Sequence, residues 1–309
     1  MPDKVPGHGR LYLQAALATA VWGASYPFTK QLMSEVSPLT IVVSRAAIGA
    51  LLLVLLGGAR LSPRDFRGAP LLKLFILSVL GVSAQQYIQA YALKYTLASN
   101  AGWLICTIPI MVAGLAAALG ERLGPFKLAA FALGTAGTLL VVFGRAGAGA
   151  FALPSTTGDV IFLTSCVEWT IYVYCAQRWL TDWPQAKVTA ATMLVALASV
   201  LPVWLLSGGP ADYAAVSPRG WAGIAYLGVL SSAMGYLFWN RAVEGLGGVK
   251  ASYFIYLQPF SSMLAAYLLL GERAAPAAFA GGLLILAGVY LVGLKEKTRA
   301  AAGGVSANA

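Results

Sequence analysis

Long apolar runs follow one another along almost the whole chain and constrain its fold more than any other feature. A helix of about 20 apolar residues crosses the roughly 30 Å hydrocarbon core of a bilayer. Charged residues, glycine and proline separate ten such runs, at 11–30, 38–57, 69–91, 97–118, 126–144, 158–178, 187–206, 219–240, 249–270 and 275–294. With 59% hydrophobic and only 10% charged residues, the 309-residue chain has no room for a large extramembrane domain.

The pattern within these runs favours helices over strands. The runs are longer than membrane strands and lack the alternation of apolar and polar residues that outer-membrane barrels need. A mean hydropathy of +0.75 agrees with burial in lipid. We therefore predict an all-α polytopic membrane protein with ten transmembrane helices, for which the lipid bilayer is an obligate partner.

The basic residues predict how the chain is oriented. The formal charge is +10, but the basic residues lie singly or in threes beside apolar runs, as in cytoplasmic loops, and not in a patch for nucleic acid. With the N-terminus inside, fifteen basic residues fall on the cytoplasmic side and five on the other, while Arg45 lies within a span. We expect a retained first span, both termini in the cytoplasm, a multi-pass location in the inner (plasma) membrane and no nucleic-acid partner.

Residues for enzymatic or metal chemistry are scarce. Cys106, Cys166 and Cys175 all lie inside apolar runs, and their odd number and spacing predict neither disulfides nor a zinc site. The single histidine, His8, lies near the N-terminus, and no catalytic motif occurs. We expect no enzymatic activity, no metal and no cofactor.

The chain also repeats itself. The tripeptide Gly-Glu-Arg at 120–122 recurs at 271–273, Pro109 recurs as Pro259, and Trp22 pairs more faintly with Trp169. Five spans per half is an odd number, so the second half is expected to enter the membrane upside down, as in inverted-repeat transporters. The predicted organisation is a first five-helix repeat at 1–144, a linker at 145–157, a second, inverted five-helix repeat at 158–295 and a cytoplasmic tail at 296–309.

These residues resemble the drug/metabolite transporter superfamily. The resemblance rests on Trp22-Gly23 in the first span, Arg45 in the second after Pro38, and the proline-to-Gly-Glu-Arg segments that close the fourth and ninth spans. It covers about residues 10–295 and is closest to the EamA-type branch of ten-helix exporters. It implies a basket in which spans 1, 3, 4, 6, 8 and 9 line a central cavity while spans 5 and 10 pack peripherally.

Polar side chains in the third and fourth spans are candidates for contact with a substrate. Gln86 and Gln89 share one helix face, and Tyr87 shares a face with Tyr91, where their rings could contact an apolar substrate. Asn100 opens the fourth span. Such groups either join helices or line a wet pathway, and the sequence leaves both readings open.

Two prolines at matching positions predict broken helices. Pro109 and Pro259 each remove a backbone donor in the middle of a span and mark either a hinge beside the binding site or a tolerated kink. Tyr253, Tyr256 and Gln258 lie beside the second proline and are further candidates for substrate contact.

Aromatic residues deep in the spans are expected either in the helix core or in the walls of a substrate chamber. The candidates are Trp22, Tyr26, Trp103, Trp169 and Tyr172. Their rings would offer stacking and cation–π contacts to an amphipathic substrate.

The sequence allows more than one role for each charged residue inside or at the end of a span. Glu168, inside the sixth span, could couple protons, recognise an amine or form a structural ion pair. Arg45 is expected to have a structural or loop-anchoring role before ligand contact. Lys30 is expected to snorkel to the interface in preference to steering a carboxylate at the exit. The glutamates of the Gly-Glu-Arg turns are expected to accept from amides that open the next helix.

The predicted function is export of small amphipathic metabolites, most simply aromatic or hydrophobic amino acids, by alternating access around a central chamber. Within the superfamily, the aromatic candidates named above resemble the lining of the bacterial aromatic amino-acid exporters. The alternative is a multidrug or lipophilic-cation exporter with Glu168 as counter-charge, and a sugar-phosphate or nucleotide-sugar carrier is third. A monomer is expected, although small residues at four-residue spacing are also compatible with a dimer.

Overall fold

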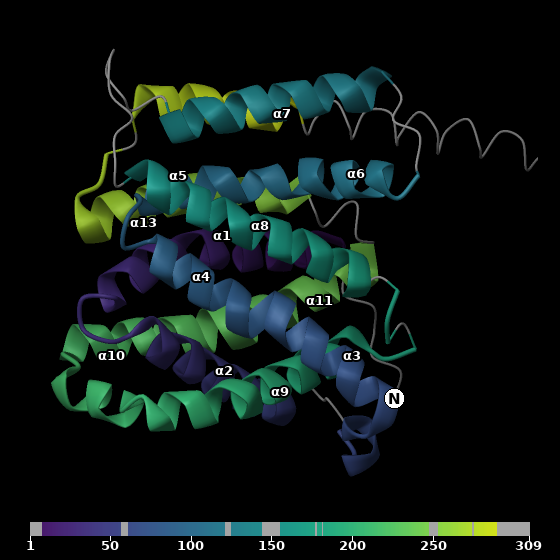
Figure 1. Cartoon of the computed structure of the whole chain (residues 1–309), viewed down its shortest axis with the longest axis vertical. Helices are drawn as coiled ribbons and strands as arrows, with labels where there is room; N and C mark the ends of the chain where they lie inside the picture. The colour runs from purple at the N-terminus through teal and green to yellow at the C-terminus, as the bar shows by residue number, and fades with distance from the viewer. Residues whose placement is uncertain are drawn as a thin grey trace, which may run out of the picture.

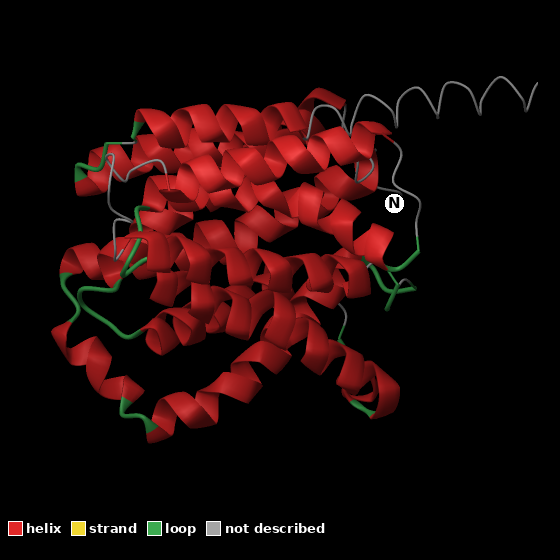
Figure 2. Cartoon of the chain, turned by 45° about the horizontal axis from the view of Figure 1, so that its top comes forward, coloured by secondary structure: helices red, strands yellow, loops and turns green. Residues whose placement is uncertain are grey.

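The computed structural model describes residues 8–56, 61–120, 125–143, 155–176, 178–180, 182–246, 253–273 and 275–288. Helices dominate these ranges, and no strand occurs within them (Figure 2). The prediction of an all-α protein is confirmed for this part of the chain. The predicted linker falls mostly on residues outside the described ranges, and its last residues already belong to the helix that begins at Ser155.

The helices follow one another with short turns between them. The elements are α1 (His8–Leu32), α2 (Pro38–Leu56), η1 (Pro63–Phe66), α3 (Gly68–Ser78), η2 (Val79–Ser83), α4 (Ala84–Ala92), α5 (Ala98–Leu104), η3 (Ile105–Thr107), α6 (Ile108–Ala118), α7 (Pro125–Phe143), α8 (Ser155–Ala176), α9 (Gln185–Leu206), η4 (Gly209–Ala215), α10 (Pro218–Ala225), η5 (Tyr226–Met234), α11 (Gly235–Leu246), η6 (Tyr253–Leu257) and α13 (Gln258–Leu270). A last helix spans Pro276–Gly288.

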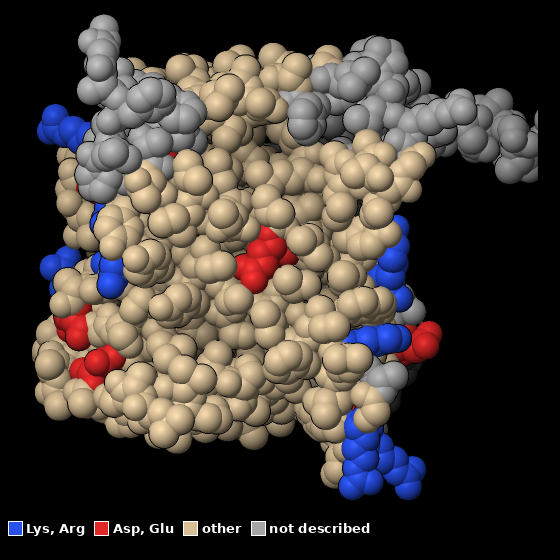
Figure 3. All heavy atoms as spheres, in the orientation of Figure 1, with Lys and Arg blue, Asp and Glu red and all other residues tan. Residues whose placement is uncertain are grey.

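Several of these helices suit a bilayer. Five are long and apolar enough to cross it: Pro38–Leu55, Pro70–Ala92, Thr157–Ala176, Ala186–Leu206 and Pro218–Leu246. The helices run side by side (Figure 1), and charged side chains gather at two opposite edges of the bundle, while the band between them on this face is uncharged except for one acidic patch (Figure 3). This is the distribution expected of a membrane protein. That all ten predicted segments cross the bilayer stays a prediction.

The two charged edges are named here by their ion pairs. At the Lys30 edge, on the left of Figure 1 with α10, Lys30 Nζ lies 2.7 Å from Glu272 Oε1. At the Lys187 edge, on the right with α3, Lys187 Nζ lies 2.9 Å from Asp65 Oδ1. Each edge therefore has a cation and a carboxylate that join distant parts of the chain.

Irregular helical turns occur at matching places in the two halves. A π-helical segment interrupts the third predicted span (η2) and another interrupts the eighth (η5). A 3₁₀ turn precedes Pro109 (η3) and another precedes Pro259 (η6), so each proline occupies the first turn of a new α-helix. The predicted breaks are therefore present, and proline fits there because the first turn needs no amide donor.

The repeated glycine has a backbone reason. Gly120 follows α6 with a φ of +100°, and Gly271 follows α13 with a φ of +66°. This left-handed conformation ends many helices and is one that glycine adopts without strain. The Gly-Glu-Arg turns therefore repeat a helix stop.

The two halves interlock instead of forming separate domains. α1 packs against α13 and α11, α2 against α9 and η5, and α4 against α8. At the top of Figure 1, α7 lies beside the last helix, and a Cβ on Gly137 would come within 2.5 Å of the Gly281 carbonyl. These two glycines therefore permit the close approach that small-residue spacing predicts.

Candidate functional site

Trp22 lies near the middle of α1 and faces the second half of the chain. Its indole Nε1 donates to the carbonyl of Ser231 at 3.0 Å. Its ring lies 5.1 Å from that of Tyr236, edge to face, and 5.4 Å from that of Trp239. An aromatic group with a fixed orientation thus forms where α1 meets η5 and α11.

Tyr26, one turn further along α1, connects the same helix to two others. Its hydroxyl donates to Gln258 Oε1 at 3.2 Å, and its ring meets Phe162 of α8 edge to face at 5.6 Å. Tyr26 and Gln258 are both buried. The amide next to Pro259 is therefore held by a phenol from the other half of the chain.

Arg45 lies near the middle of α2 and reaches η5. Its Nε donates to Ser232 Oγ and its Nη2 to Ser231 Oγ, each at 3.2 Å. Both serines are fully buried within the π-helical segment. The phenols of Tyr236 and Tyr26 are close enough to interact electrostatically with the guanidinium.

These side chains form one group, which we call the central cluster. Its members are Trp22, Tyr26, Arg45, Ser231, Ser232, Tyr236 and Gln258. They come from α1 and α2 of the first half and from η5, α11 and α13 of the second. Among them, Trp22, Tyr26 and Gln258 were expected from the sequence, whereas the serines and Tyr236 were missed because nothing local distinguishes them from other residues of an apolar helix.

The glutamines of α4 are buried with spare hydrogen-bonding capacity. Gln86 is 5% exposed and Gln89 is 8% exposed. Gln86 Oε1 and Gln89 Nε2 have no hydrogen-bond partner. A buried polar atom without a partner costs about 1–3 kcal/mol, so such atoms often mark a place where water or a ligand binds.

Tyr87 does not join these glutamines. Its side chain is 41% exposed, and that of Tyr91, one turn later, is 37% exposed. The two tyrosines therefore lie on a different face of α4 from the two glutamines, and a role of Tyr87 in substrate contact stays a prediction. The helical period separates the two faces, but the sequence alone did not say which face is buried.

Trp103 lies in the helix core. It is fully buried between Phe260 and Phe279, whose rings lie at 5.7 and 5.8 Å, and it packs against Gly282. The core reading of this tryptophan is favoured, and the structure does not bring it to the central cluster. Contacts with residues far away in the sequence decide between a place in the helix core and one in the wall of a substrate chamber.

The aromatic pair on α8 lies beside the central cluster. The rings of Trp169 and Tyr172 are 4.7 Å apart, and the Tyr172 ring packs on Gly81 of η2. The Tyr172 phenol lies near that of Tyr236. Tyr172 therefore extends the cluster toward α4.

Glu168 lies in the middle of α8. Its Oε2 is buried and has no hydrogen-bond partner, and it makes no ion pair with any residue that the structure describes. Figure 3 shows an acidic patch in the middle of the otherwise uncharged face over α8. The structural ion pair considered from the sequence is therefore disfavoured.

Two of the three candidates beside Pro259 lie in different surroundings. The side chain of Tyr253 lies outside what the structure describes. Tyr256 is partly buried and packs against the hydrophobic cluster that contains Trp103. Gln258 joins the central cluster through its hydrogen bond with Tyr26.

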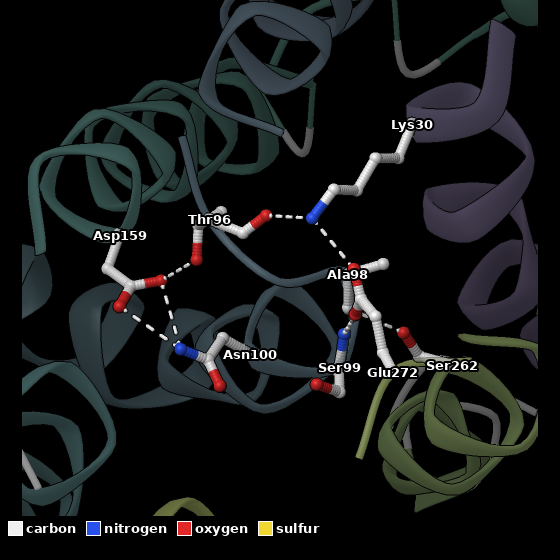
Figure 4. A network of polar contacts seen from close by, with 8 residues as sticks. All are labelled: Lys30, Thr96, Ala98, Ser99, Asn100, Asp159, Ser262 and Glu272. Carbon is white, nitrogen blue, oxygen red and sulfur yellow. Dashed lines mark hydrogen bonds and ion pairs between the residues drawn. The ribbon is translucent and has the colours of Figure 1, made fainter. Parts of the chain in front are cut away.

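Lys30 and Glu272 form part of a network at the Lys30 edge (Figure 4). Lys30 Nζ donates to the Thr96 carbonyl at 2.5 Å as well as to Glu272 Oε1. Glu272 Oε2 accepts from the amide of Ser99, in the first turn of α5, at 3.4 Å. Lys30 therefore has a carboxylate partner at this edge, and Glu272 accepts from a helix start in the other half.

Asp159 completes this network. It is fully buried and accepts two hydrogen bonds from Asn100 Nδ2, at 3.1 and 3.3 Å, and one from Thr96 Oγ1. Asn100 is thus part of this edge and not of the central cluster. Asp159 was missed because it stands at the start of a predicted span, where a carboxylate resembles a loop residue.

Comparison with known proteins decides the class of this molecule. The family model described as "EamA-like transporter family" matches residues 10–143 and 156–294. The chain belongs to the EamA-like transporter family. EamA proteins are part of the drug/metabolite transporter superfamily, so the resemblance seen in the sequence is confirmed.

Relatives agree with this assignment. An uncharacterized transporter of Archaeoglobus fulgidus is 28% identical, with 94% of this chain and 99% of the relative covered. A "Probable terminal-alkyne amino-acid exporter" of Streptantibioticus cattleyicolor is 27% identical, with 89% and 91% covered. A solved structure described only as "Crystal structure of protein" has a TM-score of 0.65 at 21% identity, covering 94% of this chain and 98% of that one, and shows the same fold.

Hydrogen bonds at the edges of this EamA transporter keep two carboxylates ionised. The hydrogen bond from Lys187 and the amide of Ser62 hold the pKa of Asp65 below its usual value. Partial burial would raise the pKa of Asp212, but hydrogen bonds from Thr40 Oγ1 and the Ser37 amide outweigh it and lower that pKa. Both carboxylates therefore stabilise the fold while ionised.

Proposed function

We propose that this EamA transporter exports aromatic or other hydrophobic amino acids across the inner membrane by alternating access. The observation that carries the proposal is the central cluster, where aromatic rings lie beside buried polar groups from both halves of the chain. Apolar walls with a few placed polar groups suit a small amphipathic ligand. The amino-acid exporter among the relatives supports this substrate class.

The proposed architecture is ten spans in two inverted five-helix repeats around a central cavity. The family model matches each half separately, and the π and 3₁₀ turns recur at matching positions. In Figure 1, α6 ends at the right edge and α13 at the left edge, which supports an inverted second half. The excess of basic residues would place the Lys187 edge, and both termini, in the cytoplasm.

In this mechanism the Lys30-edge network acts as a gate. Lys30, Thr96 and Ser99 belong to the first half, and Glu272 belongs to the second, so their contacts hold the halves together at this edge. Opening the edge requires these bonds to break, while Pro109 and Pro259 give each half a place to bend. We propose that a monomer is sufficient for this cycle.

Uptake into proteoliposomes tests the proposal. The purified protein should take up labelled phenylalanine and tryptophan by counterflow, and unlabelled aromatic amino acids should compete. Liposomes without protein provide the background, and glutamate serves as a non-aromatic competitor. If aromatic amino acids neither move nor compete, the amino-acid function is wrong.

A lipophilic-cation exporter is the second candidate, and Glu168 favours it. Its unpaired carboxylate oxygen within the membrane band could accept an organic cation or a proton. The same liposomes should then transport a labelled quaternary ammonium compound, and Glu168→Gln should abolish that flux. If Glu168→Gln instead leaves cation flux and pH-gradient dependence unchanged, this candidate and proton coupling through Glu168 are excluded.

A further inference from the structure

Arg45 is the only cation of the central cluster, and its partners are neutral. Its guanidinium donates to the hydroxyls of Ser231 and Ser232, each at 3.2 Å. Arginine has five N–H donors, so these two bonds leave the Nη1 group and one Nη2 hydrogen unused. Among the residues that the structure describes, no carboxylate contacts Arg45.

Other cations that join distant helices are paired differently. Lys30 has Glu272 at 2.7 Å, and Lys187 has Asp65 at 2.9 Å. Both of these pairs lie at the edges of the bundle, where water also stabilises charge. Arg45 lies between the edges, where a charge without a counter-charge is more costly. A purely structural arginine would be expected to have the carboxylate that the edge cations have.

The surroundings of Arg45 indicate what supplies the missing charge. The two serine hydroxyls bind the Nε and Nη2 atoms of the guanidinium. The backbone carbonyl of Ser231 also accepts the indole N–H of Trp22. The rings of Trp22 and Tyr236 meet at 5.1 Å beside it. A carboxylate on the free side of the guanidinium would therefore have aromatic surface within reach of its side chain.

We propose that Arg45 is the substrate-carboxylate anchor of this transporter, held in position by Ser231 and Ser232. The planar fork of arginine matches a carboxylate through two parallel hydrogen bonds. This inference rests on the proposed amino-acid function and adds the residue that recognises the acidic end of the substrate. A single cation among aromatic rings fits a monovalent carboxylate better than a divalent phosphate.

Binding to the full-length protein in lipid nanodiscs tests the anchor. The probes are phenylalanine, phenylalaninamide, which lacks only the carboxylate, 3-phenylpropionate, which lacks only the amine, and inorganic phosphate. Wild-type protein should bind phenylalanine and 3-phenylpropionate at least about tenfold more tightly than the amide, as expected for a paired charge. Phosphate should not compete.

Variants assign this preference to Arg45. Arg45→Gln should remove the preference for the carboxylate while leaving the affinity for phenylalaninamide within about twofold of wild type. Arg45→Lys keeps the charge but loses the planar guanidinium, so its ratio of phenylalanine affinity to phenylalaninamide affinity should be about a third of the wild-type ratio or less. The control Lys187→Gln removes a cation at the edge and should change neither affinity. If Arg45→Gln does not fold, the ratio measured for Arg45→Lys decides, and an unchanged ratio overturns the anchor.

The outcomes separate the anchor from the proposed function. If 3-phenylpropionate binds through Arg45 but phenylalanine is not transported, the anchor stands and the amino-acid function fails. If Arg45→Gln weakens all probes equally, or phosphate displaces 3-phenylpropionate, the carboxylate anchor is wrong. If wild-type protein does not distinguish phenylalanine from its amide, the anchor is also wrong, whatever the transport assay shows.

Discussion

The Lys30 edge and the central cluster each contain one cation among polar side chains, but the two cations have different partners. At the edge, Lys30 pairs with Glu272, and Asp159 accepts hydrogen bonds from Asn100 and Thr96 (Figure 4). In the centre, Arg45 has only hydroxyl partners. The edge thus supplies a counter-charge for its cation, whereas the described residues in the centre supply none for Arg45.

Removing the aromatic wall of the centre should have the largest effect. Trp22→Ala deletes the ring that contacts Tyr236 and the indole bond to Ser231. We expect aromatic amino-acid transport to fall by more than about tenfold, because a deleted aromatic contact loses both burial and its fixed geometry. The control is Trp221→Ala, whose 49% exposed ring lies away from the cluster. Equal loss in both variants would remove the distinction between centre and surface.

Breaking the ion pair should open the Lys30 edge. Ser99 is 1% exposed, so a cysteine there should react slowly with a membrane-impermeant maleimide. In a Cys175→Ser background, Lys30→Gln and Glu272→Gln should each raise the labelling of Ser99→Cys by about five- to tenfold, since either change removes the same contact. The double variant should not exceed the larger single effect by much, because the two residues form one contact.

The matched control for this gate is Lys187→Gln at the opposite edge. It removes an ion pair of nearly the same length, 2.9 Å, without touching the Lys30 edge. Labelling at position 99 should stay at the wild-type rate. A rise similar to that of Lys30→Gln would mean that the protein has loosened generally, and the gate would be contradicted.

The two faces of α4 should differ by a smaller factor. Gln89 is buried with an unpaired Nε2, whereas Tyr87 is 41% exposed. Gln89→Ala should raise the KM for amino acids about threefold, the size expected for one lost hydrogen bond. Tyr87→Ala should leave KM and the maximal rate within experimental error. A larger effect of Tyr87→Ala would place that residue in the binding site.

The smallest effect concerns pH and stability at the edges. Because hydrogen bonds lower the folded-state pKa of Asp212, its stabilising contribution is present above its unfolded pKa of about 4 and disappears as the pH falls through the folded value. Asp212→Asn should therefore lower Tm at pH 7 by on the order of 1–2 °C. The difference from wild type should shrink toward pH 3 in thermal unfolding followed by fluorescence. If the Tm difference between wild type and Asp212→Asn grows as the pH falls, ionised Asp212 does not stabilise the fold.

Some site residues were predictable because helical spacing and depth are local properties. Trp22 and Tyr26 share a face of one helix, and both belong to the central cluster. Gln86 and Gln89 were expected together and are both buried. Asp159 shows the limit of such reasoning: its burial depends on Thr96 and Asn100, more than 50 residues away in the sequence.

Apolar length and the absence of strand alternation by themselves determined that this is a helical membrane protein, because transfer to lipid and helix formation depend on neighbouring residues. Tertiary packing decided which polar groups meet. Arg45 and Ser231 are separated by 186 residues, and only the contact of α2 with η5 brings them together. The indole nitrogen of Trp22 has a carbonyl partner and that of Trp103 has none among the described residues, because residues on other helices, and not residue type, set the environment of a buried side chain.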